Sequence, residues 1–159
     1  MPISSAPIMY GSKVAGSDLL PWEWARTRLD AARNYWISTT RPDGRPHCRP
    51  VWAVWLDDAL WFSTGSLAQH NLTTNHAITA HLEDGDEVVI VEGIAVAAHG
   101  HPSLQQMCDR YGAKYDWPIY PTDTGIRDDN SALGPVFRVV PEVVFGWGER
   151  TAKPTRWVF

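Results

Sequence analysis

Hydrophobic and polar positions along this chain form short alternating or continuous apolar stretches, which predict β-strands more often than helices. The predicted strands are rich in β-branched and aromatic residues, and most are bounded by turn-forming residues. They cover residues 35–40, 51–56, 59–63, 77–82, 87–98, 136–140, 142–147 and 155–159. Seven or eight strands with few helices indicate a mainly β protein built as an antiparallel β-barrel.

Apolar residues recur at helical spacing in three places, residues 21–34, 67–74 and 102–111, the last with Gly112 after its end. The segment 113–134 is rich in turn formers, and its length is typical of a functional loop. Its aromatic residues favour a loop that packs against the protein or covers a ligand. They include Tyr115, Trp117 and Tyr120.

The chain of 159 residues is long enough for one domain with a sizeable core. Residues 1–18 mix Ser, Gly, Pro and Ala without periodicity, so we expect a flexible N-terminal arm. Residues 19–159 are expected to form a single domain. Glu92 and Gly93 interrupt the longest predicted strand and suggest a bend or bulge there.

Two segments in the first half of the chain are candidates for binding. Pro46 and Pro50 remove ladder donors, which indicates a sheet edge or bulge and makes Arg49 a candidate ligand contact. A solvated edge arginine is the alternative. The segment 63–66 joins a strand end to a helix start, and its polar groups could hold a phosphate. The alternative is that Ser66 only caps the helix.

Composition narrows the class of protein. A net charge of −4 and a pI near 5.8 give no general attraction to nucleic acid or to an anionic membrane. Two cysteines give no disulfide framework, and we find neither an export signal nor an apolar run long enough to span a membrane, so we expect a cytoplasmic protein. Nine tryptophans indicate an aromatic core, a large interface or a stacking surface for a flat ligand.

The familiar catalytic motifs are missing. The six histidines and two cysteines show neither CxxC nor HExxH spacing, so no metal site is expected. A GxSxG motif, a Rossmann fingerprint and a Walker loop are also lacking. What remains is a site for an aromatic, phosphorylated cofactor, with Arg49 and the polar segment 63–66 as its candidate anchors.

Several segments together carry a resemblance to a known family: TTRPDGRPHCRPVWAVW, WFSTGS, HNL, GDEVVIVEG and the closing TRWVF. From about Leu20 onward the chain resembles the pyridoxamine 5'-phosphate oxidase-like split β-barrel proteins. More narrowly, it is similar to the actinobacterial flavin/deazaflavin oxidoreductases that use FMN or coenzyme F-420. The resemblance implies an antiparallel split β-barrel with a few short flanking helices.

The resemblance also implies a homodimer, with a cofactor in each groove between the subunits. Gln69 and His70 stand where the family usually has Arg or Lys on the phosphate. Trp157 resembles the chain end that reaches the partner's site, and a core tryptophan is the alternative. The cofactor-binding residues that it implies are Arg49, Pro50, Val51, Trp52, Ser63, Thr64, Gln69, His70, Asn71, Arg156 and Trp157. Tyr115, Trp117 and Tyr120 are candidates for covering a substrate pocket.

By resemblance, the chain is expected to be an oxidoreductase that transfers hydride between its cofactor and a small unsaturated or quinone-like molecule. Coenzyme F-420 is the first choice of cofactor and FMN the second. No catalytic acid or base is identified, and hydride transfer requires mainly orientation and exclusion of water. The alternative is a non-catalytic protein of the same fold that binds or carries a flavin, a deazaflavin or haem.

Overall fold

The computed structural model describes residues 1–9, 12–13 and 18–159. Its helices are α1 (Trp22–Ala31), α2 (Leu67–Leu72), α3 (Leu104–Tyr115) and the 3-10 turn η1 (Glu149–Thr151). Its strands are β1 (Ile3–Ser5), β2 (Ile8–Met9), β3 (Ser12–Lys13), β4 (Tyr35–Thr40), β5 (Pro46–Val51), β6 (Ala53–Leu56), β7 (Ala59–Ser63), β8 (Ala77–His81), β9 (Val88–Ala97), β10 (Tyr120–Thr122), β11 (Gly125–Arg127), β12 (Ala132–Gly134), β13 (Val136–Gly148) and β14 (Ala152–Val158).

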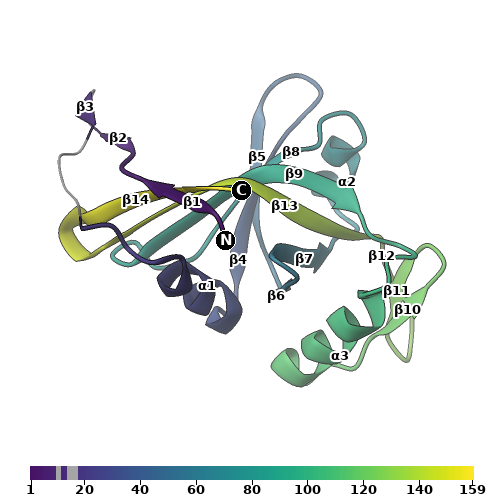
Figure 1. The fold of residues 1–159 in the computed structure, drawn as a ribbon. Coiled ribbons are helices and arrows are strands. Elements are labelled where there is room, and N and C mark those ends of the chain that lie inside the picture. The colour runs from purple at the N-terminus through teal and green to yellow at the C-terminus, as the bar shows by residue number, and fades with distance from the viewer. Residues whose placement is uncertain (10–11, 14–17) are drawn as a thin grey trace.

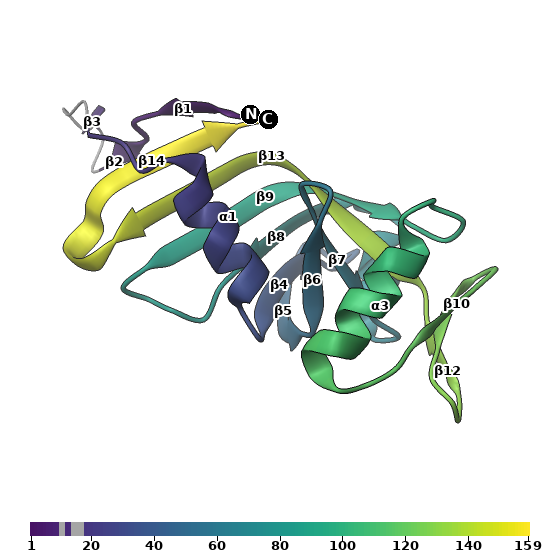
Figure 2. The same cartoon turned by 60° about the horizontal axis from the view of Figure 1, so that its bottom comes forward.

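One strongly curved antiparallel sheet forms the body of the protein (Figures 1 and 2). Its strands follow the order β1-β14-β13-β9-β8-β4-β5, and the β6–β7 hairpin joins through β7 to the first part of β13. Helix α1 crosses one face of the sheet, and α3 lies beside β6 with β10–β12 beyond it (Figure 2). The predicted fold class, a mainly antiparallel β-barrel with few helices, is confirmed.

Strands β6 and β7 are buried on both faces, because they separate two hydrophobic clusters. The side chains of Trp55 and Phe62 enter the barrel interior, where they join the core that also contains Tyr35. The alternate residues, such as Val54 and Trp61, pack instead against α3. This arrangement explains the continuous apolar runs in these two strands.

The bend predicted at Glu92 and Gly93 exists, but the extra residue lies on the neighbouring strand. The register between β9 and β13 shifts between Pro141 and Val143, opposite Gly93 and Glu92. A Cβ at Gly93 would lie 2.1 Å from the Val140 carbonyl oxygen, so only glycine fits this close approach. Residues 136–140 and 142–147 are therefore parts of one bulged strand, not two strands.

The strand predicted at residues 51–56 is interrupted at Trp52. Strand β5 ends at Val51 and β6 begins at Ala53. The two strands have different partners, because β5 pairs with β4 whereas β6 pairs with β7. Strand β5 lies at the sheet edge as predicted, and its register with β4 is regular, without a bulge.

Two predictions about the second half of the chain are wrong. Helix α3 does not end before Gly112 but continues to Tyr115. The segment 113–134, predicted as a loop, contains the end of α3 and the small antiparallel sheet β10-β11-β12. Gly125 has a left-handed φ of 159°, and a Cβ there would lie 2.0 Å from the Gly134 carbonyl oxygen, so the sheet depends on this glycine.

Within the predicted N-terminal arm, residues 3–5 form β1, which pairs with β14 from Ile3 opposite Val158 to Ser5 opposite Arg156. The chain ends consequently lie side by side (Figure 2). Residues 10–11 and 14–17 of the arm lie outside the described residues, so flexibility there stays a prediction. No helix in the described part of the chain is long and apolar enough to cross a membrane.

Candidate functional site

A groove lies where β5 and β7 end beside α3. It consists of two adjoining cavities of about 420 and 320 Å³, which share Arg49, Trp52, Ser63 and Tyr111. The larger cavity is completed by Thr64, Gly65, Ser66, Trp117, Ile126 and Leu133, and the smaller one by Asn34, Pro50 and Val51. Cavities of this size suit a small-molecule ligand.

Arg49 gives the groove its charge. Among the described residues that line the two cavities, it alone carries a formal charge. The half-buried side chain shares a face of β5 with Val51, and its Nε donates a hydrogen bond to the Pro50 carbonyl oxygen at 3.3 Å. The terminal guanidinium nitrogens are suited to an anionic group such as a phosphate.

Hydroxyl groups at the end of β7 form the polar side of the groove. The Ser63 hydroxyl donates to the Pro135 carbonyl oxygen at 2.9 Å. The Thr64 and Ser66 hydroxyl oxygens lie 2.7 Å apart, so one donates to the other and one hydroxyl proton is left for a ligand. Ser66 also accepts a hydrogen bond from the Ala68 amide and caps α2, so it is both a helix cap and part of the cavity wall.

Aromatic side chains form the opposite side of the groove. The Trp52 indole stacks on the Tyr115 ring, with centroids 4.6 Å apart and planes 5° apart. Tyr111 and Trp117 surround the indole at centroid distances of 6.3 and 6.0 Å. Burial raises the pKa of Tyr111 to about 12, so its phenol stays protonated at neutral pH. A planar ring bound here would meet flat aromatic surfaces.

Helix α2 carries three of the residues predicted to bind a cofactor, and none of them lines the described cavities. His70 is exposed and Gln69 is partly exposed, so their role in binding phosphate stays a prediction. Asn71 is fully buried, and its Nδ2 donates to Thr39 Oγ1 at 2.9 Å. That bond fastens α2 to β4, which is a structural role.

The prediction that Trp157 contacts a cofactor does not fit its position. Its side chain is fully buried and packs against Trp22, with ring centroids 5.7 Å apart, and beneath Gly146. The alternative, a core tryptophan, describes this position. Arg156, the neighbouring residue on β14, pairs with Phe145 and also lies outside the lining of the two cavities.

Of the three aromatic residues predicted to cover a substrate pocket, Trp117 alone lines the described cavities. Tyr115 is buried behind Trp52 and supports the groove from within. Tyr120 is exposed on β10 and lies against the Arg127 guanidinium, 4.8 Å from ring centroid to Cζ. The structure therefore gives Tyr115 and Tyr120 roles other than lining the pocket.

Sequence reasoning missed four residues that line the groove, namely Asn34, Tyr111, Ile126 and Leu133. Tyr111 belonged to the apolar face of a predicted helix, which gave no sign that part of this face lines a cavity. Ile126 and Leu133 lie on β11 and β12, in a segment predicted as a loop. In the described part of the chain, no three His, Cys, Asp or Glu side chains are grouped to hold a metal ion.

The fold and groove define an antiparallel split β-barrel protein with a groove of mixed polar and aromatic lining. The family model described as pyridoxamine 5'-phosphate oxidase matches residues 22–148, which extend from the start of α1 to the end of β13. The chain belongs to this family, which includes oxidases and reductases. No curated protein matches the chain.

Several solved structures share the fold at low sequence identity. A conserved hypothetical protein from Mycobacterium tuberculosis is 21% identical, with a TM-score of 0.70 over 88% of this chain and 92% of that one. An F-420 reductase is 21% identical, with a TM-score of 0.54 over 75% and 94%. A FAD-binding protein from Mesorhizobium loti is 15% identical, with a TM-score of 0.56 over 88% and 96%. Proteins that bind flavin-type cofactors are thus among those with this fold.

Proposed function

We propose that the groove binds a flavin-type cofactor and that the protein is an oxidoreductase acting on a small unsaturated or quinone-like molecule. One observation carries the proposal. The groove has one cationic side chain and one available hydroxyl donor on one side, and stacked aromatic rings on the other. This is the combination that a phosphorylated, planar cofactor requires. Coenzyme F-420 is the first choice and FMN the second.

The residues present fit such a cofactor. Arg49 and the Thr64–Ser66 hydroxyl pair would hold the phosphate, since they supply a positive charge and a hydrogen-bond donor. Trp52 and Trp117 would contact the ring system. When bound, the cofactor supplies hydride-transfer chemistry. The preference for coenzyme F-420 is supported by the sequence resemblance and by the fold shared with an F-420 reductase.

The side chains of the groove would orient the reactants and exclude water from them. Ile126 and Leu133 add apolar surface to the cavity that Trp117 also lines. The protonated Tyr111 phenol reaches both cavities and would donate a hydrogen bond to an oxygen of the cofactor or substrate. We assign no proton transfer to it.

We also propose that the protein is a homodimer. Val96 and Val140 are exposed on the outer face of the β9–β13 pair, and Trp117 is 45% exposed at the groove, so a second copy would cover apolar surface in both places. The free cysteines, of which Cys48 is exposed, are compatible with the reducing cytoplasm as its location.

The second candidate is a protein of the same fold that carries a flavin, a deazaflavin or haem without catalysis. The observation that favours it is the pair Gln69 and His70, which replace the family's basic residues and lie outside the lining of the described cavities. Weaker binding of the phosphate would suit a carrier protein, which must release its cofactor.

Titration of the purified protein with coenzyme F-420, FMN and haem, followed by absorbance and fluorescence, tests these proposals. We expect saturable binding of coenzyme F-420 or FMN, and reduction of a quinone by the loaded protein. Saturable binding without turnover of any quinone tested would favour the carrier. No saturable binding of either flavin-type cofactor would refute the proposed oxidoreductase.

A further inference from the structure

Side chains at the end of α3 hold the backbone of Ala53, the residue that follows Trp52. The Ala53 amide donates to Tyr115 Oη at 2.9 Å, and the Ala53 carbonyl oxygen accepts from Lys114 Nζ at 3.1 Å. Tyr115 Oη also lies 2.8 Å from that carbonyl oxygen. Two consecutive residues of α3 therefore fix the point at which the chain passes from β5 to β6.

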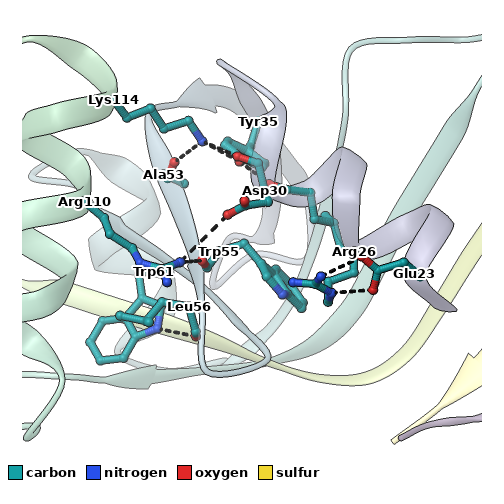
Figure 3. A network of polar contacts seen from close by, with 11 residues as sticks. Glu23, Arg26, Asp30, Tyr35, Ala53, Trp55, Leu56, Trp61, Arg110 and Lys114 are labelled. Carbon is teal, nitrogen blue, oxygen red and sulfur yellow. Dashed lines mark hydrogen bonds and ion pairs between the residues drawn. The ribbon is translucent and has the colours of Figure 1, made fainter.

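Lys114 has two further partners. Its Nζ donates to Tyr35 Oη at 2.9 Å and to the Asp30 carbonyl oxygen at 3.3 Å (Figure 3). An ammonium group has three N–H donors, and here three oxygens receive them. These oxygens belong to α1, β4 and β6, so one side chain joins three elements to the last turn of α3.

The network reaches the groove through Tyr115. Its ring stacks on Trp52, and the Trp52 indole lines both cavities. Trp52 lies in the break between two strands, where its side chain depends on contacts with α3. A small rotation of the end of α3 would therefore tilt the flat surface that a planar ligand meets.

We propose that Lys114 is a positioning residue, whose ammonium group anchors the end of α3 so that Tyr115 holds the Trp52 indole flat against the ligand space. The consequence for ligand binding rests on the proposed function of the groove. The positioning itself is a property of the protein without ligand, so it can be measured separately.

The surroundings of Lys114 make this anchor sensitive to pH. Burial lowers its pKa to about 8, and the Asp30 carboxylate acts in the opposite direction. A neutral amine has two N–H donors for the same three oxygens. Tyr35 cannot replace the missing donor, because its hydroxyl proton goes to the Leu29 carbonyl oxygen. One contact is therefore weakened as the pH rises through about 8.

The ionisable groups around Lys114 come from three elements, and β6 contributes its backbone. They are Asp30 of α1, Tyr35 of β4, and Arg110 and Tyr115 of α3, together with Arg33 in the segment between α1 and β4. Burial raises the pKa values of both tyrosines, to well above the usual range for Tyr35, so neither phenol ionises near pH 8. A change near that pH is thus assigned to Lys114.

Fluorine NMR of the full chain labelled with 5-fluorotryptophan tests the positioning. The Trp52 signal is assigned with Trp52→Phe and followed between about pH 6.5 and 9.5, which spans the lowered lysine pKa. In the wild type we expect the Trp52 signal to shift with pH, with a midpoint near 8. In Lys114→Met the signal should have a different chemical shift that does not change with pH. In Lys114→Arg it should keep the wild-type low-pH chemical shift at every pH. Lys153→Met, a change at an exposed lysine paired with Asp18, is the control and should titrate like the wild type.

A Trp52 signal that does not titrate in the wild type, or that titrates equally in Lys114→Met, would overturn the proposal. The wild-type titration decides the matter even where Lys114→Met does not fold. As a second readout, FMN should bind Lys114→Met up to about tenfold more weakly, because a tilted Trp52 indole stacks less well on the ligand ring, with recovery in Lys114→Arg. If the wild type bound no FMN, the proposed function would fail for that cofactor, while the NMR result would still decide the positioning.

Discussion

At the scale of single residues, Arg49 is the foremost candidate for ligand binding, because it is the charged side chain of the groove lining. Arg45, on the same hairpin, is more exposed and forms hydrogen bonds to Asp43 within the turn. The two arginines therefore form a matched pair: one faces the candidate site and the other stabilises its own loop.

We predict that Arg49→Ala weakens the binding of FMN or coenzyme F-420 about tenfold, since a charge-assisted hydrogen bond contributes roughly 1.5–3 kcal/mol. Arg45→Ala should leave the dissociation constant unchanged. Fluorescence titration of both variants measures the difference. Equal affinities of Arg49→Ala and the wild type would remove Arg49 from the site.

Asn71 is predicted to stabilise the fold through its hydrogen bond to Thr39. Asn71→Ala should lower the free energy of unfolding by about 1–3 kcal/mol, because the buried Thr39 hydroxyl loses its donor. Gln69→Ala on the same helix is the control, and we expect it to stay within about 0.5 kcal/mol of the wild type. Urea denaturation compares them, and equal stability of both variants would contradict this role.

Local sequence was sufficient to single out Arg49, Ser63 and Thr64, which lie in the groove lining, since a proline-containing edge strand and a strand-to-helix junction are both visible as short patterns. It was not sufficient for Trp157, whose burial depends on α1 and β13 packing around it. Whether a side chain faces the core or a ligand is decided by residues distant in sequence.

At the scale of secondary-structure elements, the bulge in β13 allows one strand to take part in both halves of the barrel. Its first part pairs with β7 and its last part with β14, while β9 follows it along both. The close approach of Val140 to Gly93 accompanies this bend. We therefore expect the fold to be sensitive to any side chain at Gly93.

Gly93→Ala should destabilise the protein by about 3 kcal/mol or more, because overpacking against backbone can be relieved only by moving β13. Gly85→Ala is the control, since a Cβ there has no atom within 4 Å among the described residues. The midpoints of urea unfolding give the comparison. Similar stability of the two variants would show that β9 and β13 can move apart at Gly93 with little loss of folding free energy.

Lys114 should make stability depend on pH in a definite direction. Its pKa is lowered in the folded protein, so between about pH 8 and its ordinary value the unfolded chain binds more protons. Stability from this group therefore rises with pH in that window. We predict that the free energy of unfolding of the wild type, relative to Lys114→Met, increases between about pH 7.5 and 9.5. A constant difference would contradict a lowered lysine pKa.

The length of α3 shows a limit of helix-end signals. Gly112 is a common type of residue at a helix end, but here it lies within the helix, where a Cβ would make only ordinary contacts with Trp117 and Pro118. The helix ends at Tyr115 instead, and the C-cap residue Asp116 adopts a left-handed conformation with φ of 53°. Local sequence does not distinguish a glycine inside a helix from one that ends it.

At the scale of the whole molecule, the abundant tryptophans contribute both to an aromatic core and to a surface on which a flat ligand could stack. Trp22, Trp55 and Trp157 pack in or against the barrel core, whereas Trp52 and Trp117 line the groove. Most strand positions along the chain and the barrel class were predictable, since both depend on short-range patterns. The groove was not, because it forms between β5, β7, α3 and the small β10–β12 sheet.

A homodimer interface, besides the core and the groove, is a third place where aromatic and apolar side chains are expected to be buried. Size-exclusion chromatography with light scattering should give a mass twice that of the 17.8 kDa chain. Substituting Val140 with Glu on the exposed face of β13 should shift the protein toward the single chain, since it places a charge in the interface. A wild-type mass of one chain would contradict the dimer.

Hydrogen exchange followed by mass spectrometry, with and without saturating coenzyme F-420 or FMN, tests the central claim most directly because it locates the ligand. We predict slower exchange on binding in peptides that contain residues 49–53, 63–68 and 111–117, which include the main walls of the groove. A separate cavity, lined by Asp30 and Ala31 of α1 and by Arg110 of α3, lies outside the groove. Saturable binding that leaves the predicted peptides unchanged, or that protects only this separate cavity, would contradict a cofactor site in the groove.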